Sequence, residues 1–188
     1  MGYERDSLAA SLATAAARII VESELTDWSL ARRKAVAERG LSAHAVPLPS
    51  DDEIIAEIKT YHALYSGDEW AEQLRAQREF ALEAMAELIR FNPVLLGPVA
   101  EGWAHAGSEI RIEIKPDNPK EVEYALIELG VEFEPTLAKD GTVLLEVIDG
   151  DWPMRIVVRE RGRPPDPRFR VRLSGAQVQQ LLREKTAD

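Results

Sequence analysis

The stretch LLGPVAEGWAHAGSEIRIEI, residues 95–114, combines residue types that suit phosphate and metal chemistry. A glycine-rich segment leads into a run in which Glu109, Arg111 and Glu113 alternate with isoleucine. Because successive side chains of a strand point to opposite faces, these three charged groups share one face. Carboxylates are ligands that Mg²⁺ prefers, whereas a guanidinium has no lone pair to offer a metal. The central question is whether this face binds a metal ion or an anion.

A second charged feature lies between Arg155 and Arg172, where the chain has seven Arg, no Lys, and only Glu160 and Asp166 as acids. This segment therefore has a net charge of +5 (seven minus two), and since the whole chain is −10, the rest is −15. The planar guanidinium suits phosphate or carboxylate. A solvated strand and loop with surface salt bridges is the alternative interpretation. The acidic remainder argues against non-specific binding of nucleic acid along the whole surface.

The first half of the chain predicts helices. Apolar residues recur at helical spacing in 7–23, and Thr26 or Asp27 is the expected N-cap of a second helix that ends at Gly40. Ser50 and Glu53 form a capping-box signature for a third helix. A longer helix is expected to start at Asp68 and to end before Asn92-Pro93.

The second half predicts strands and two helices. Short strands are expected at 94–96, 109–114, 131–135, 142–148 and 154–160, with a helix at 118–129 and another after Ser174. Strands followed by helices that cover them indicate an α+β fold. We expect an N-terminal helical region (1–66) followed by an α+β domain (67–188) with a small mixed sheet, the two forming either separate parts or one compact unit.

The spacing of Gly97-Pro98, ten residues, and Glu109-Ile110-Arg111 resembles the motif of the DNA-polymerase-β-like nucleotidyltransferase superfamily. In that motif, a short strand and Gly-Ser precede Asp-x-Asp on the next strand. The whole chain also resembles a set of small bacterial proteins that are nucleotidyltransferase-like by fold and have no settled activity. The resemblance implies a minimal nucleotidyltransferase-like domain in residues 67–188.

The resemblance also implies two Mg²⁺ ions held by carboxylates, and here the chain departs from the pattern. Glu109 keeps the first carboxylate, but Arg111 replaces the second and would repel the ion. Glu113 and Glu146 are the remaining candidates for catalytic carboxylates, with Mg²⁺ as the cofactor if the protein is active. The later strand offers Arg155 where a third carboxylate is expected. We expect Arg111 and Arg155 to bind an anion directly, through charge-assisted hydrogen bonds.

The resemblance places Gly97, Gly102 and Ser108 around the phosphates of a nucleotide. Pro98 replaces the serine of the motif and lacks both a hydroxyl and a backbone N–H, so two donors to phosphate are lost. The phosphate cradle is thus expected to be damaged together with the metal site.

Three functional classes follow. The first is a catalytically degenerate nucleotidyltransferase-like protein that binds a nucleotide, another anion or a macromolecular partner. The second is an active enzyme that moves a nucleoside monophosphate from a nucleoside triphosphate to a hydroxyl, with Mg²⁺ on Glu109 and on Glu113 or Glu146. The third is an interaction module, including a homodimer, whose helical half makes the contacts.

The amino-acid composition limits the cellular compartments and the partners that we expect for this protein. The chain has no cysteine, which excludes disulfides and thiolate metal sites and fits a reducing cytoplasm. No apolar run reaches the roughly 20 residues of a membrane-spanning helix, so we expect no membrane partner. Nucleic acid as a partner is left open.

Overall fold

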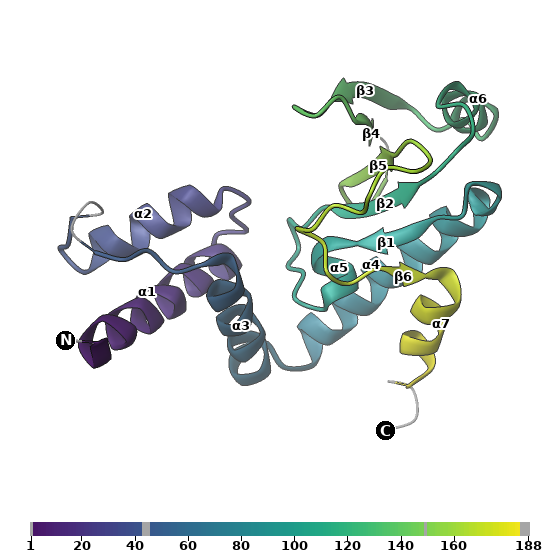
Figure 1. Ribbon diagram of the computed structural model, residues 1–188. Helices are drawn as coiled ribbons and strands as arrows, with labels where there is room; N and C mark the ends of the chain where they lie inside the picture. Colours follow the sequence, from purple (N-terminus) through teal and green to yellow (C-terminus); the bar gives the residue numbers. More distant parts are fainter. Residues whose placement is uncertain (1, 43–45, 149, 185–188) are drawn as a thin grey trace. The chain divides into compact units, whose positions relative to one another are not determined.

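A computed structural model describes residues 2–42, 46–148 and 150–184 (Figure 1). It confirms the α+β fold class, with helices and a mixed sheet that has six strands within the described residues. The chain divides into two compact units, one of residues 1–73 with 105–107, the other of residues 74–104 with 108–188. The expected boundary between residues 66 and 67 stays a prediction.

The first unit is helical. Its helices are α1 (Gly2–Glu22), α2 (Trp28–Glu38) and α3 (Asp51–Tyr61), followed by a π-helical turn at His62–Ser66 and the beginning of α4 (Gly67–Glu87). The expected caps are present: Asp27 accepts a hydrogen bond from the backbone N–H of Leu30, and Ser50 and Glu53 form the capping box. Each cap satisfies backbone donors that a helix start leaves without partners.

The second unit holds the sheet. Along the chain its elements are the end of α4, a 3₁₀ turn (Ile89–Phe91), β1 (Val94–Leu96), α5 (Gly97–Glu101), β2 (Ile110–Ile114), α6 (Lys120–Glu128), β3 (Phe133–Leu137), β4 (Val143–Val147), β5 (Met154–Val158), β6 (Leu173–Ser174) and α7 (Gly175–Glu184). The strand order is β3-β4-β5-β2-β1-β6. Strands β2 and β5 run parallel, and the other neighbouring pairs run antiparallel.

Alternation along the strands separates an apolar face of the sheet from a charged one. The register aligns Leu145, Ile156, Ile112 and Leu95 in one row across four strands, and all four are at most 1% exposed. The neighbouring row belongs to the other face and carries charged side chains. The core therefore fixes which residues of β2, β4 and β5 point toward the candidate site.

The glycine-rich segment after β1 begins with a short helix. Residues Gly97–Glu101 form the short helix α5, with Pro98 in its first turn and Gly102 in a left-handed conformation (φ 75°) at its end. Proline suits the first turn of a helix because its fixed φ is helical and its missing N–H has no partner there. Pro98, which lacks two donors to phosphate, therefore favours the start of α5.

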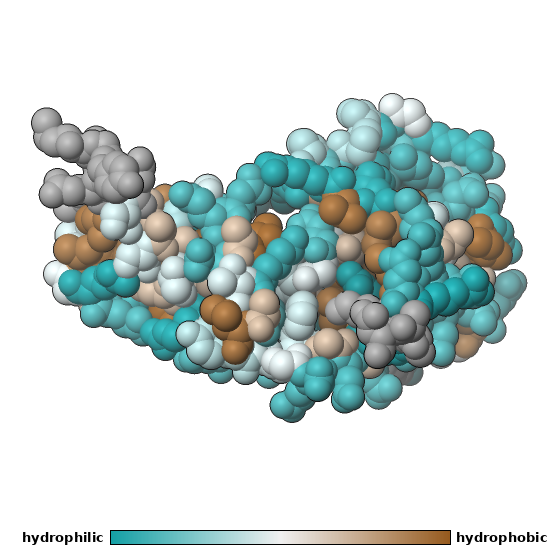
Figure 2. All heavy atoms as spheres, turned by 90° about the horizontal axis from the view of Figure 1, so that it is seen from below, coloured by the Kyte–Doolittle hydropathy of each residue, from teal (hydrophilic) through white to brown (hydrophobic). Residues whose placement is uncertain are grey.

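The described residues include a buried apolar core, but several large hydrophobic side chains, such as Tyr65 and Ile89, are exposed. Figure 2 shows one face of the surface, on which hydrophobic residues form small groups separated by hydrophilic ones. Among the residues that the structure describes, no helix combines the length and the apolar composition needed to cross a membrane.

Candidate functional site

The charged face of the sheet places two arginines side by side. The register aligns Arg155 of β5 with Arg111 of β2 on one side and with Glu146 of β4 on the other. Leu96 of β1 continues the row beyond Arg111. The parallel pairing of β2 and β5 therefore brings together Arg111 and Arg155, which are 44 residues apart in the chain.

The two arginines are held by carboxylates that the sequence analysis assigned to a metal. The Nη2 atom of Arg155 lies 3.0 Å from Glu109 Oε1 and 3.0 Å from Glu146 Oε1, and Arg111 donates from Nε to Glu109 Oε2 at 2.5 Å. All four side chains are partly exposed, so these pairs are only partly screened by water. Glu109 and Glu146 thus converge, but they converge on a guanidinium.

Glu113 lies apart from that pair. Its side chain is fully buried, and Arg159 donates from Nε to Oε2 at 2.9 Å while Arg172 bonds to Oε1. Lys115 Nζ adds a longer contact of 3.7 Å. With two guanidinium groups on its oxygens, Glu113 acts as an anchor for the segment that contains Arg159 and Arg172.

These carboxylates do not form a metal site. Within residues 2–42, 46–148 and 150–184, no group of three or more His, Asp or Glu side chains is arranged to hold a metal ion. Mg²⁺ needs several oxygen ligands in octahedral geometry, and Arg155 occupies the space between the two carboxylates that converge. The residues present therefore do not fit the two-metal arrangement that the motif resemblance implies.

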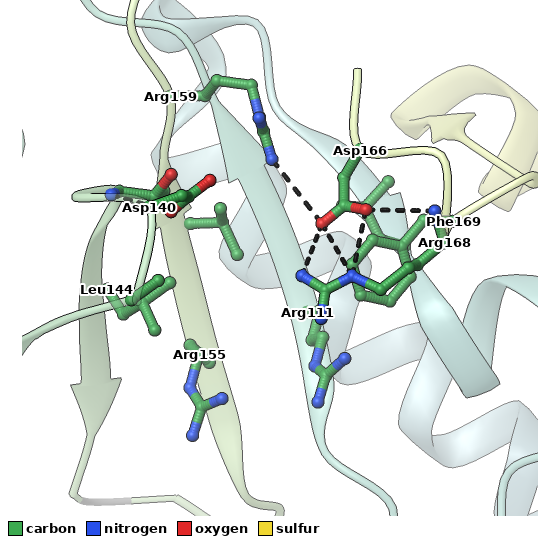
Figure 3. Close-up of a pocket in the computed structure, with 12 residues that line it drawn as sticks. Arg111, Asp140, Leu144, Arg155, Arg159, Asp166, Arg168 and Phe169 are labelled. Carbon is green, nitrogen blue, oxygen red and sulfur yellow. Dashed lines mark hydrogen bonds and ion pairs between the residues drawn. The ribbon is translucent and has the colours of Figure 1, made fainter. Parts of the chain in front are cut away.

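A pocket of about 190 Å³ lies over this face of the sheet (Figure 3). It has four arginines against two aspartates, an aromatic ring and several aliphatic side chains. The lining residues are Leu96, Arg111, Ala138, Asp140, Thr142, Leu144, Arg155, Val157, Arg159, Asp166, Arg168 and Phe169. Its lining thus has an excess of two positive charges, which favours an anionic ligand.

One wall of the pocket is the turn between β3 and β4. Asp140 accepts a hydrogen bond from the backbone N–H of Thr142 at 3.1 Å, and this bond lowers the pKa of the Asp140 carboxyl. Arg163 pairs with Asp140 at 3.0 Å and donates to the Thr142 hydroxyl at 2.9 Å. Asp140 therefore has its own cation and leaves the pocket arginines to other partners.

The opposite wall comes from the turn that contains Asp166. The Asp166 carboxylate accepts three hydrogen bonds from the Arg168 side chain, which lower the pKa of Asp166 and raise that of Arg168. Arg159 Nη2 approaches the same carboxylate at 4.0 Å. Figure 3 shows Asp166 between these two arginines.

The predicted phosphate-binding residues have different positions. A Cβ atom on Gly97 would lie 3.7 Å from both Arg111 Cδ and Phe169 Cε1, so Gly97 borders the pocket. Gly102 ends α5, where a Cβ would lie 3.2 Å from Arg78 Nη2. Ser108 is buried and is not among the pocket-lining residues. The structure brings together Gly97, Arg111 and Arg155, with Glu109 and Glu146 beside them.

Sequence reasoning missed most of the pocket's rim. Arg159, Asp166, Arg168 and Phe169 lie outside the motif and reach the pocket from the arginine-rich segment. The excess of Arg over Lys in that segment was the available signal, because guanidinium groups suit buried ion pairs and anions. The pairing of Arg159 with Glu113, 46 residues away, has no local signature.

Comparison with known proteins identifies no family for this chain. No family model and no curated protein matches it. Among solved structures, a cytoplasmic RNA terminal U-transferase is similar over 71% of this chain and 42% of that protein, at 14% identity and a TM-score of 0.39. Cid1, an RNA terminal uridylyl transferase, is similar over 70% of this chain and 40% of that protein, at 14% identity and a TM-score of 0.37. The chain spans less than half the length of either protein.

Proposed function

We propose that residues 67–188 form a nucleotidyltransferase-like domain that binds a nucleotide, or another phosphate-bearing anion, through arginine and without a divalent metal ion. One observation carries the proposal: Arg155 lies between Glu109 and Glu146, and Arg111 lies beside it. The position where carboxylates would clamp a metal thus holds fixed positive charge. The proposed setting is the cytoplasm of a bacterial cell.

The pocket arginines have donors left for a ligand. Arg155 Nε is buried and has no hydrogen-bond partner among the described residues. A buried donor without an acceptor costs free energy, and an anion that reached Arg155 Nε would recover it. A phosphate offers several acceptor oxygens to guanidinium groups, and such charge-assisted bonds are about twice as strong as neutral ones. Arg111 and Arg155 are therefore the proposed primary contacts.

No step of nucleotidyl transfer is assigned to these residues. Transfer by the two-metal route needs carboxylates free to hold ions between the attacking and leaving oxygens. Glu109 and Glu146 are instead engaged by Arg155, and Glu113 is buried against Arg159. The residues in the pocket can bind, orient and neutralise an anion, which is the activity proposed.

Isothermal titration with ATP, in EDTA and again in Mg²⁺, tests the proposal. We expect binding in EDTA to be at least as tight as in Mg²⁺, because the contacts are to Arg and bound Mg²⁺ neutralises part of the phosphate charge. Binding that requires Mg²⁺ would contradict the proposal and favour the metal-dependent enzyme. Absence of binding in both conditions would contradict it as well and would move the search to protein partners.

Arg155→Ala is expected to weaken ATP binding in EDTA by at least about tenfold, because charge-assisted hydrogen bonds to a partly buried cation are lost. Arg161→Ala is the matched control. Arg161 belongs to the same segment, but it is largely exposed, pairs with Asp117 and does not line the pocket. An equal loss of affinity in both variants would indicate attraction by overall charge and not a defined site.

A further inference from the structure

The turn that carries Asp166 covers part of the arginine pocket. Backbone N–H of Phe169 donates to the carbonyl of Asp166 at 3.1 Å, and the N–H of Arg168 donates to Asp166 Oδ1 at 3.0 Å. Pro165 and Pro167 flank the aspartate and restrict the backbone. The turn is therefore preorganised, and its geometry aims the Asp166 carboxylate at Arg159 and Arg168.

Asp166 acts as an anion already present in the pocket. Its side chain is only 13% exposed, although it belongs to an irregular segment at the surface. It accepts hydrogen bonds of 2.7, 3.1 and 3.2 Å from the Arg168 side chain and approaches Arg159 at 4.0 Å. An ionised carboxylate with two guanidinium neighbours presents the same kind of contact that a phosphate oxygen would make.

Phe169 extends this cover to Arg111. The guanidinium carbon of Arg111 lies 5.2 Å from the centroid of the Phe169 ring, within the range of a cation–π contact. The same ring packs against Gly97, where a Cβ atom would be in contact with it. One turn therefore supplies an anion to two pocket arginines and an aromatic cover to a third.

The segment is fixed at both ends and irregular between them. Arg159 and Arg172 both bind the buried carboxylate of Glu113, while the residues from 159 to 172 belong to no helix or strand. Movement of the Asp166 turn can thus occur without detaching the segment from the sheet. Such a movement disrupts the cation–π contact of Phe169 with Arg111 and the ion pairs of Asp166 with Arg159 and Arg168.

We propose that the Asp166–Phe169 turn is an internal competitor, in which the Asp166 carboxylate holds Arg159 and Arg168 until a phosphate-bearing ligand displaces it. This inference rests on the proposed function and adds a device that regulates it. A phosphate has more charge and more acceptor oxygens than a carboxylate, so it can replace Asp166 on both arginines. Singly charged carboxylate ligands are excluded by the same competition.

Titration of Asp166→Asn with ATP and with inorganic pyrophosphate, both in EDTA, tests the inference. Asparagine keeps the Oδ1 acceptor for the Arg168 N–H, so the turn is retained while the charge is removed. We expect binding of both ligands to tighten about tenfold, the scale set by one charge a few ångströms away at a partly exposed site. If the affinity rises for ATP but not for pyrophosphate, Asp166 does not compete with phosphate groups and the inference is wrong.

Asp117→Asn is the matched control, because it removes one negative charge from an exposed ion pair with Arg161 outside the pocket. Its affinity is expected to stay within about twofold of the wild type. If the wild type binds ATP and Asp166→Asn binds it no more tightly, Asp166 is not a competitor, and the proposed function is unaffected. If neither the wild type nor Asp166→Asn binds ATP, both the inference and the proposed function are wrong. Asp166→Ser, which also keeps a local acceptor, repeats the test if the asparagine variant does not fold.

Discussion

Replacing Glu113 with glutamine is expected to lower the free energy of unfolding of the sheet unit by about 3 kcal/mol or more. Glu113 is fully buried, and Arg159, only 6% exposed, depends on it for its charge partner. Without the carboxylate, a buried guanidinium is left with Asp166 at 4.0 Å as its remaining acid. Removal of one member of a buried ion pair is costly because the other charge has already lost its water.

Urea unfolding measures this loss, and Glu123→Gln is the control. Glu123 pairs with Lys120 on α6, where the lysine is largely exposed, so its replacement is expected to change stability by at most about 0.5 kcal/mol. A similar small change for Glu113→Gln would mean that the Arg159 and Arg172 contacts do not anchor the segment. In that case the proposed fixed ends of the Asp166 turn would also be lost.

Acidification from pH 7 to pH 4 is expected to remove about 3 kcal/mol of stability from the helical unit through His62. Burial, together with a smaller contribution from the charge of His105, lowers the pKa of His62 from 6.5 to about 4. The unfolded chain therefore binds a proton near pH 6.5, whereas the folded chain excludes it until about pH 4. The stabilisation is complete above pH 6.5 and is lost as pH falls through this window.

The surroundings of His62 explain why its neutral form is favoured. Its ring stacks on Trp70 with centroids 4.4 Å apart, and Nδ1 lies 3.0 Å from Ser66 Oγ. Nε2 is buried without a hydrogen-bond partner among the described residues, so a second proton there would have no acceptor. Tyr61 contacts the ring edge-on and brings no charge.

Titration of the His62 ring by NMR checks the pKa, and urea unfolding at several pH values checks the stability. His62→Gln is expected to flatten the dependence of stability on pH between pH 6.5 and pH 4. His105→Gln is a necessary companion, since burial also lowers the pKa of His105 and its slope has the same sign. An unchanged slope in His62→Gln, or an NMR pKa near 6.5, would contradict the assignment.

Local signals in the sequence predicted most elements of the fold. The alternation of Ile110, Ile112 and Ile114 with charged residues predicted the two faces of β2. Caps at Asp27 and Ser50 marked helix starts correctly. Such features depend on residues a few positions apart, so one sequence suffices to find them.

Features that depend on distant residues were not predictable. The short strand β6 exists because it pairs with β1, and its two residues carry no strand signal of their own. The helix that starts after the Ser50 cap ends at Tyr61 and is followed by a π-helical turn at His62–Ser66, where His62 packs on Trp70. In the candidate site, the proximity of Arg111 and Arg155 was anticipated from the motif. The contacts of Asp166 and Phe169 could not be predicted, because they depend on the path that the chain takes after β5.

The most direct test of anion binding without metal is the NMR spectrum of the arginine Nε–Hε groups during titration with ATP in EDTA. Arg155 Nε has no hydrogen-bond partner in the described part of the chain and Arg111 Nε bonds to Glu109, so both should shift as ATP binds. The exposed Arg161 should not. Saturable shifts of Arg111 and Arg155 in EDTA are the predicted result. Shifts that appear only with Mg²⁺, or only outside the pocket, would contradict the account.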